Sequence, residues 1–109
     1  MAAVCGTLKQ LMAELKAGLA GVYGPRLHVV CLFGSYARGD ADAESDVDVL
    51  VVLDDFTQYG AEVDRTSELV ANLSLQYSVS LSTVFVRRND WLHGDSPFLV
   101  NVRKEAIAA

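Results

Sequence analysis

Two pairs of residues with phosphate and metal chemistry lie close together in the stretch GSYARGDADAESDVDVLVVL, residues 34–53. Gly34 and Ser35 directly follow an apolar run, and Asp46 and Asp48 stand at the head of the next one. The backbone N–H of a glycine can approach a bulky anion closely, and a serine hydroxyl adds a second donor. Carboxylates at the entrance of a buried strand are costly unless a cation meets them. The spacing therefore indicates a phosphate-binding corner beside a cation-binding one.

The two aspartates are spaced so that together they can hold a divalent cation. Asp46 and Asp48 are two residues apart on an expected strand, so both carboxylates project from one face, with Cα atoms roughly 7 Å apart. Mg²⁺ prefers carboxylate and phosphate oxygens, and bridging Mg²⁺ ions stabilise the attacking and leaving oxygens in nucleotidyl transfer. If the two strands are antiparallel neighbours, the glycine–serine corner and the carboxylates meet. The residues thus predict a site for Mg²⁺ and a nucleoside triphosphate.

The elements that position these residues follow from hydrophobic periodicity. Apolar runs rich in β-branched residues predict buried strands, and apolar stripes at three- and four-residue spacing predict amphipathic helices. A serine followed by proline predicts the start of a last helix. The expected order is helix 8–19, strand 27–33, a polar loop 34–45 with at most one helical turn, strand 46–53, helix 57–76, strand 77–86 and a helix from Pro97 to the end. This order predicts an α/β (α+β) fold.

Size and composition limit the possible functions. The chain has 109 residues, and we expect residues 1–109 to form a single domain. Its net charge of −5 argues against direct binding of nucleic-acid backbones, which needs clustered positive charge. No run approaches the roughly 18 apolar residues that span a bilayer, and no secretory signal is visible. Cys5 and Cys31 have no metal-binding spacing. We expect a cytoplasmic domain without membrane contact.

The central stretch resembles a known signature. Gly34-Ser35, ten intervening residues and Asp46-x-Asp48 are similar to the motif of the minimal nucleotidyltransferases (MNT), small relatives of the DNA polymerase beta superfamily. The tail SPFLVNVRKEAI, residues 96–107, also resembles the ending of these proteins. The resemblance implies a small mixed sheet flanked by helices, as in the polymerase beta-like fold. It also implies Mg²⁺-dependent transfer of a nucleoside monophosphate from a triphosphate.

The resemblance further implies roles for particular residues and partners. Asp46 and Asp48 would be catalytic and hold the metal, and the nucleotide-binding residues would be Gly34, Ser35, Arg38 and Ser45. For Arg38, contact with the triphosphate and pairing with an acid of its own loop remain alternatives. Many short members resemble antitoxins that act with a helical HEPN protein, and some transfer AMP from ATP to a tyrosine of it. We therefore expect ATP and a HEPN-domain protein as partners, with a homo- or hetero-oligomer as a further possibility.

One departure from the family pattern supports a second hypothesis. Members normally supply a third carboxylate from a later strand, and the matching place here is Ser80. No acid occurs anywhere in residues 69–89. Serine is a poor base for deprotonating an acceptor hydroxyl. The alternative to an enzyme is therefore a catalytically impaired module that binds a nucleotide or a HEPN partner.

Overall fold

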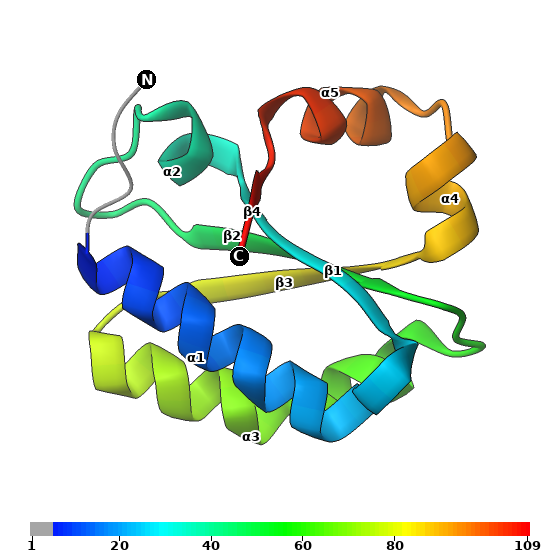
Figure 1. The fold of residues 1–109 in the computed structure, drawn as a ribbon. Coiled ribbons are helices and arrows are strands. Elements are labelled where there is room, and N and C mark those ends of the chain that lie inside the picture. The colour runs from blue at the N-terminus through cyan, green and yellow to red at the C-terminus, as the bar shows by residue number, and fades with distance from the viewer. Residues whose placement is uncertain (1–5) are drawn as a thin grey trace.

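A mixed four-stranded sheet forms the centre of the computed structural model, which describes residues 6–109 (Figure 1). The elements are α1 (Gly6–Tyr23), η1 (Gly24–Arg26), β1 (Leu27–Phe33), α2 (Gly34–Arg38), β2 (Val47–Leu53), α3 (Tyr59–Tyr77), β3 (Leu81–Arg87), α4 (Arg88–His93), α5 (Pro97–Glu105) and β4 (Ile107–Ala108). The strand order is β3-β2-β1-β4. β1 is antiparallel to β2 and β4, whereas β2 and β3 are parallel. The expected mixed sheet flanked by helices is confirmed.

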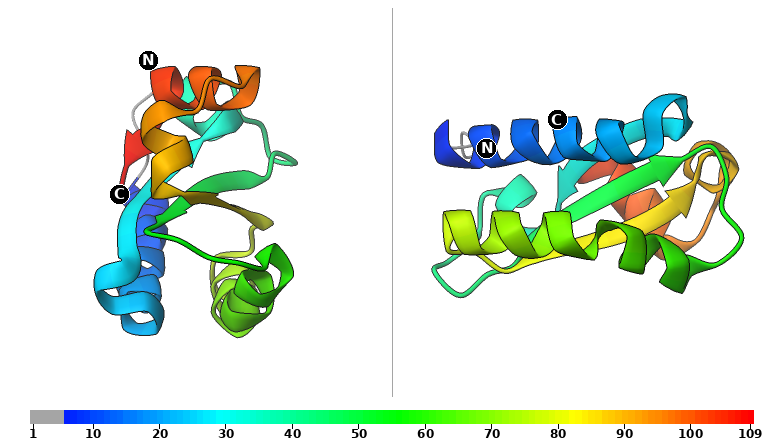
Figure 2. Two further views of the ribbon diagram at one scale, coloured as in Figure 1. Left: turned by 90° about the vertical axis from the view of Figure 1, so that its right-hand side faces the viewer. Right: turned by 90° about the horizontal axis from the view of Figure 1, so that it is seen from below.

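Strand β2 is the most deeply buried element within residues 6–109. Residues 49–53 each have 0% of their surface exposed. Successive side chains of a strand point to opposite faces, so an apolar strand of this kind requires cover on both faces of the sheet. Helices supply that cover on both sides (Figure 2).

Helices α1 and α3 pack on one face of the sheet. The buried side of α1 is a single apolar stripe with three- and four-residue spacing, as an amphipathic helix requires. Its members are Leu8, Leu11, Met12, Leu15, Leu19 and Tyr23. This stripe packs with Val49 and Val51 of β2 in the larger of two apolar clusters. The predicted helices 8–19 and 57–76 are thus confirmed, with α1 four residues longer at its C-terminal end.

Helices α4 and α5 pack on the opposite face. Val102 and Leu99 of α5 and Trp91 of α4 belong to a smaller apolar cluster that contains Leu50 and Val52 of β2. Val102 is the buried residue of α5, at 3% exposure. Asp48 precedes Leu50 by two residues and therefore lies on this face of the sheet. None of the helices within residues 6–109 is both long and apolar enough to cross a membrane.

The prediction for the start of the third strand was wrong. Strand β3 begins at Leu81, whereas the alternation of apolar residues had predicted a strand from Tyr77. Helix α3 continues to Tyr77 and ends at Ser78, whose φ of 54° is left-handed. The N–H of Val79 then bonds to the carbonyl of Ser74, a pattern that closes a helix C-terminus. Helix termination thus uses residues whose apolar alternation indicated a strand.

The C-terminal region also differs from expectation. Helix α5 begins at the predicted Pro97, and the side chain of Ser96 accepts a hydrogen bond from the N–H of Leu99. The helix ends at Glu105 instead of running to the end, because the next residues pair with β1 as the short strand β4. Helix α4 was not predicted at all. Its six residues are too few for an amphipathic repeat to be recognised.

Candidate functional site

Gly34 lies at the junction of β1 and α2 and is in direct contact with Asp48. Its φ of +74° is left-handed, a conformation that favours glycine. A β-carbon placed on Gly34 would stand 2.3 Å from Oδ2 of Asp48. The contact arises because Phe33, the last residue of β1, pairs with Asp48 in the antiparallel register. The structure therefore brings together the two predicted site residues that lie at the end of one strand and the start of the next.

Asp48 is partly buried, whereas Asp46 precedes β2 and is exposed. Burial raises the pKa of Asp48, the negative charges of Asp46 and Glu105 raise it further, and the positive charge of Arg38 opposes them. A raised carboxyl pKa means that the ionised form is disfavoured in this surrounding. A cation next to Asp48 would relieve that cost. The surroundings of Asp48 would therefore suit a bound cation, and the cation-binding roles of Asp46 and Asp48 stay predictions.

Glu105 is the residue of this corner that sequence reasoning missed. Its Oε2 accepts a hydrogen bond of 2.6 Å from the backbone N–H of Gly34. The same oxygen lies 3.3 Å from Nη1 of Arg38. Glu105 lies inside the tail, residues 96–107, that resembles the minimal nucleotidyltransferases. No local spacing links it to Gly34, which is 71 residues away in the chain.

Arg38 stands at the end of α2 with about half of its side chain exposed. Its Nε lies 3.4 Å from Asp40 of its own loop, and its Nη1 contacts Glu105 from α5. Of the two alternatives for Arg38, pairing with an acid of its own loop is therefore observed. The guanidinium also remains beside Gly34, within reach of an anion bound there, because both groups share Glu105 as their partner.

The remaining predicted residues occupy the turn and loop around Gly34. Ser35 is the second residue of α2, and its carbonyl accepts hydrogen bonds of 3.0 Å from the N–H groups of Gly39 and Asp40. The hydroxyl of Ser45 accepts a hydrogen bond of 2.9 Å from the N–H of Asp42. Ser45 thus holds its own loop in shape, directly before Asp46. The nucleotide-binding roles of Ser35 and Ser45 stay predictions.

The residues that lie beside Asp46 and Asp48 on the third-strand side of the sheet are serines, so no third carboxylate is supplied from there. The carbonyl of Ser80 accepts a hydrogen bond of 2.8 Å from the N–H of Val47, so Ser80 lies directly before β3 at the level of Asp46. Ser82 pairs with Asp48 in the parallel register. Both serines are exposed and lie on the face that carries Asp48. A carboxylate at either position would have joined the pair, and neither is acidic.

Two carboxylates suit Mg²⁺ better than a cation that takes all of its ligands from the protein. Within residues 6–109 no group of three or more His, Cys, Asp or Glu side chains is arranged to hold a metal ion. Mg²⁺ is commonly bound by one or two carboxylates, with waters and substrate phosphates as the remaining ligands. Asp46 and Asp48 are such a pair, and the Gly34 corner lies against Asp48.

Comparison with known proteins identifies the family. The family model described as "Nucleotidyltransferase domain" matches residues 24–106, which include the whole sheet except β4. The chain belongs to the nucleotidyltransferase family. The match contains the glycine–serine corner, both aspartates and Glu105. The resemblance to the minimal nucleotidyltransferases is thereby confirmed.

Two proteins of Methanocaldococcus jannaschii are related to this nucleotidyltransferase domain in sequence, and their names describe them as candidate protein adenylyltransferases. One is 33% identical over 79 residues, which cover 72% of this chain and 79% of the relative. The other is 34% identical over 76 residues, which cover 70% of each protein.

Solved structures share the fold of this nucleotidyltransferase. A candidate nucleotidyltransferase from Sulfolobus solfataricus aligns over 99% of this chain and 89% of its own, with a TM-score of 0.59 and 19% identity. A chain of a toxin–antitoxin structure with AMP-PNP aligns over 86% of this chain and 68% of its own, with a TM-score of 0.58 and 23% identity. At these identities the likeness concerns the fold alone.

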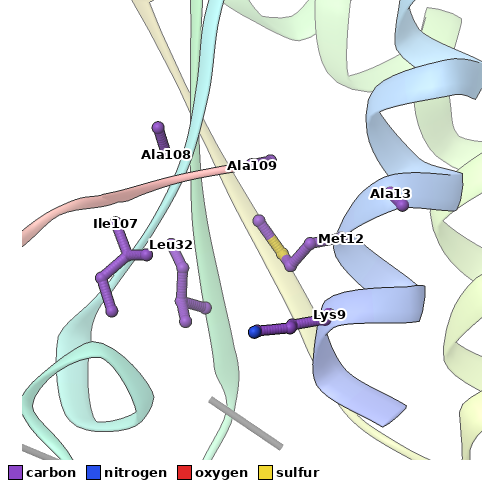
Figure 3. A pocket seen from close by; sticks show the side chains of 7 residues that line it. All are labelled: Lys9, Met12, Ala13, Leu32, Ile107, Ala108 and Ala109. Carbon is purple, nitrogen blue, oxygen red and sulfur yellow. The ribbon is translucent and has the colours of Figure 1, made fainter. Parts of the chain in front are cut away.

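The nucleotidyltransferase also contains an apolar pocket of 280 Å³ between α1 and β4, which is distinct from the charged corner (Figure 3). Its lining consists of Lys9, Met12, Ala13, Leu32, Ile107, Ala108 and Ala109. Leu32 points toward α1, whereas Asp48 lies on the opposite face of the sheet. The pocket therefore shares no lining residue with the site, and its apolar walls do not suit a polyphosphate.

Proposed function

We propose that this domain transfers AMP from ATP to a hydroxyl group of a protein partner. The contact between Gly34 and Asp48 carries the proposal, because it joins a place suited to phosphate with a place suited to a cation. Gly34 and Ser35 would hold the polyphosphate, assisted by Arg38. Asp46 and Asp48 would hold Mg²⁺, which neutralises phosphate charge when it is bound.

The proposed reaction replaces the phosphoanhydride bond between the α- and β-phosphates of ATP with a phosphodiester bond between AMP and the acceptor. The acceptor oxygen forms a bond to the α-phosphorus of ATP, the bond from that phosphorus to the β-phosphate bridging oxygen breaks, and pyrophosphate leaves. The proton of the acceptor hydroxyl is released to solvent or to a base on the partner. In such transfers the protein contributes mostly positioning and charge compensation. The rigid strand β2 and the Gly34 turn would supply the positioning.

The acceptor that we propose is a HEPN-domain protein, with the present domain acting as its antitoxin. The names of the two archaeal relatives support a protein acceptor and an adenylyl group. A structural neighbour that comes from a toxin–antitoxin complex supports the pairing with a toxin. The exposed position of Arg38 and Asp46 leaves the site open on one side. A partner chain could therefore bring its hydroxyl to the nucleotide and complete the walls around it.

A mass measurement tests the enzymatic proposal. The domain is incubated with ATP, Mg²⁺ and a candidate HEPN-domain partner protein, and intact-protein mass spectrometry measures whether the HEPN protein gains one AMP. Replacing both Asp46→Asn and Asp48→Asn should reduce the transfer by about 10²-fold or more. The surroundings of Asp48 disfavour its negative charge, so the neutral asparagine should not destabilise the fold and the double variant should remain folded. The matched control, Asp64→Asn with Asp95→Asn, changes the same charge at exposed positions away from the site.

Position 80 carries a serine and not an acid, which favours one alternative function: a module that binds its partner without modifying it. That alternative predicts tight complex formation and no gain of AMP. It also predicts that the double asparagine variant neutralises the HEPN protein as well as the unmodified domain does. Co-purification combined with the mass measurement separates the two functions.

A further inference from the structure

We propose that Glu105 is a built-in anion that occupies the donors intended for the nucleotide's phosphates, so that ATP binds only when the Glu105 carboxylate leaves them. The inference rests on the proposed function, because it concerns the same corner. It assigns to α5 a role in setting nucleotide affinity.

The contacts of Glu105 are those expected of a bound phosphate oxygen. Its Oε2 accepts a hydrogen bond of 2.6 Å from the N–H of Gly34 and another of 3.3 Å from Nη1 of Arg38. Both are charge-assisted contacts, which are stronger than hydrogen bonds between neutral groups. A phosphate oxygen at this corner would require the same N–H and the same guanidinium. The carboxylate and a phosphate therefore compete for one place.

The backbone of Glu105 is anchored on both sides, so its side chain alone must move. Val102 ties α5 to the apolar cluster below it, and the N–H of Ala106 bonds to the carbonyl of Val102. Ile107 then pairs with Leu32 of β1, two residues before Gly34. About a fifth of the Glu105 side chain, 21%, is exposed to solvent. A change of rotamer would release the donors while α5 and β4 stay in place.

The charge of Glu105 also opposes an incoming polyphosphate. It adds to the negative charges of Asp46 and Asp48 at the same corner. A cation would neutralise the aspartates, whereas Arg38 is the cation that faces Glu105. Once the carboxylate has left, Nη1 of Arg38 is freed for the nucleotide, while its Nε still contacts Asp40. Only the fraction of molecules with Glu105 displaced is competent, and the apparent affinity is reduced by that fraction.

The rival interpretation is a permanent clamp, in which Glu105 positions the Gly34 peptide and stays there when the nucleotide is bound. The two interpretations predict opposite effects of Glu105→Gln. A glutamine keeps an acceptor oxygen for the N–H of Gly34 but removes the charge that competes with phosphate. A displaced anion predicts tighter binding in this variant, and a clamp predicts weaker or equal binding.

Calorimetric titration with inorganic tripolyphosphate, a non-hydrolysable ATP analogue and adenosine, each with Mg²⁺, provides the test. For the first two ligands, Glu105→Gln should lower the Kd by about tenfold, a size typical of coupling between sites. Adenosine, which lacks phosphate, should bind equally to both proteins. The matched control is Glu68→Gln, which removes one negative charge from an exposed position on α3. Thermal unfolding confirms that both variants are folded.

A second measurement does not depend on the variant. In the unmodified protein, the amide resonance of Gly34 should shift when tripolyphosphate is added, because its hydrogen-bond acceptor changes. An equal or higher Kd for Glu105→Gln, or an unmoved Gly34 resonance at saturation, overturns the inference and leaves the proposed function standing. If neither protein binds the ATP analogue or tripolyphosphate, both the inference and the proposed function fail.

Discussion

Oδ2 of Asp48 lies only 2.3 Å from the position that a β-carbon on Gly34 would occupy. The carboxylate and the glycine turn therefore form one packed unit at the junction of β1, α2 and β2. Because Gly34 also has a φ of +74°, two independent physical constraints favour glycine at this position. Both constraints can be tested together by one substitution, without any substrate.

Gly34→Ala should lower the free energy of unfolding by about 2–4 kcal/mol, from the left-handed backbone and the overlap with Asp48. Urea unfolding measures this change. Gly21→Ala is the matched control, since Gly21 lies in α1 with open space around it. That control should be neutral or stabilise the helix by up to about 1 kcal/mol. Equal effects of the two substitutions would contradict the described contact.

The buried network around Glu62 should make stability depend on pH. Glu62 is 4% exposed, and its Oε1 accepts hydrogen bonds from the Tyr23 hydroxyl at 2.7 Å and from Arg65 at 3.2 Å. Burial alone raises the pKa of Glu62, but these hydrogen bonds outweigh it and hold the pKa below the usual 4.5. The stabilisation is therefore complete above pH 4.5 and is lost as the pH falls through the lower folded-state pKa.

Glu62→Gln should accordingly cost about 2 kcal/mol at pH 7, as expected for hydrogen bonds to a charged group. The difference in the free energy of unfolding between the variant and the unmodified protein should shrink as the pH falls below 4.5. Urea unfolding across the pH range measures it, and Glu68→Gln on the exposed side of the same helix serves as control. A cost that does not change with pH would show that the charge of Glu62 contributes nothing.

The thiol of Cys31 should be unreactive in the folded protein. Cys31 is 2% exposed, and burial raises its pKa to about 11. At pH 8 only about one thiol in a thousand is then a thiolate, the form that reacts. Iodoacetamide at pH 8 should leave Cys31 unmodified until urea unfolds the domain. Mapping of the labelled peptides distinguishes it from Cys5, which lies outside the described residues. Rapid labelling of native Cys31 would disprove its placement in the core.

Introducing an acid directly before β3 tests whether the serine at position 80 limits the reaction. If the proposed transfer is limited by the missing carboxylate, Ser80→Asp should raise its rate by about tenfold or more, since general bases contribute at least that much. Ser82→Asp is the comparison, because it places the acid beside Asp48 instead of at the level of Asp46. Intact-mass kinetics with ATP and the proposed HEPN partner measure both variants. No change in either variant would mean that the acceptor's surroundings already supply the base.

The sequence predicted the strands around the site well because their signals are local. The strand at 27–33 is apolar on both faces and ends at a glycine, and the structure gives the same bounds. The second strand differs by one residue, since Asp46 precedes β2. The contact of Gly34 with Asp48 then follows from antiparallel pairing of two strands that are close in the chain.

The parts that could not be predicted depend on residues far apart in the chain. Ser78 ends a helix in the left-handed conformation, although its neighbours alternate as a strand does. Ile107 and Ala108 form β4 only because an edge of β1 is available to them. Glu105 reaches Gly34 through this pairing, which no spacing in the sequence encodes. The missed residue of the site is therefore the one that tertiary packing supplies.

The burial of β2 on both faces has a consequence for motion in the domain. Amide protons of residues 49–53 should exchange with deuterium last, near the rate of global unfolding, because they occupy the best-protected strand. The exposed loop from Gly39 to Glu44 should exchange early. Asp48 would then hold a fixed position in the site, whereas the side chain of Arg38 could change its conformation when another molecule binds there.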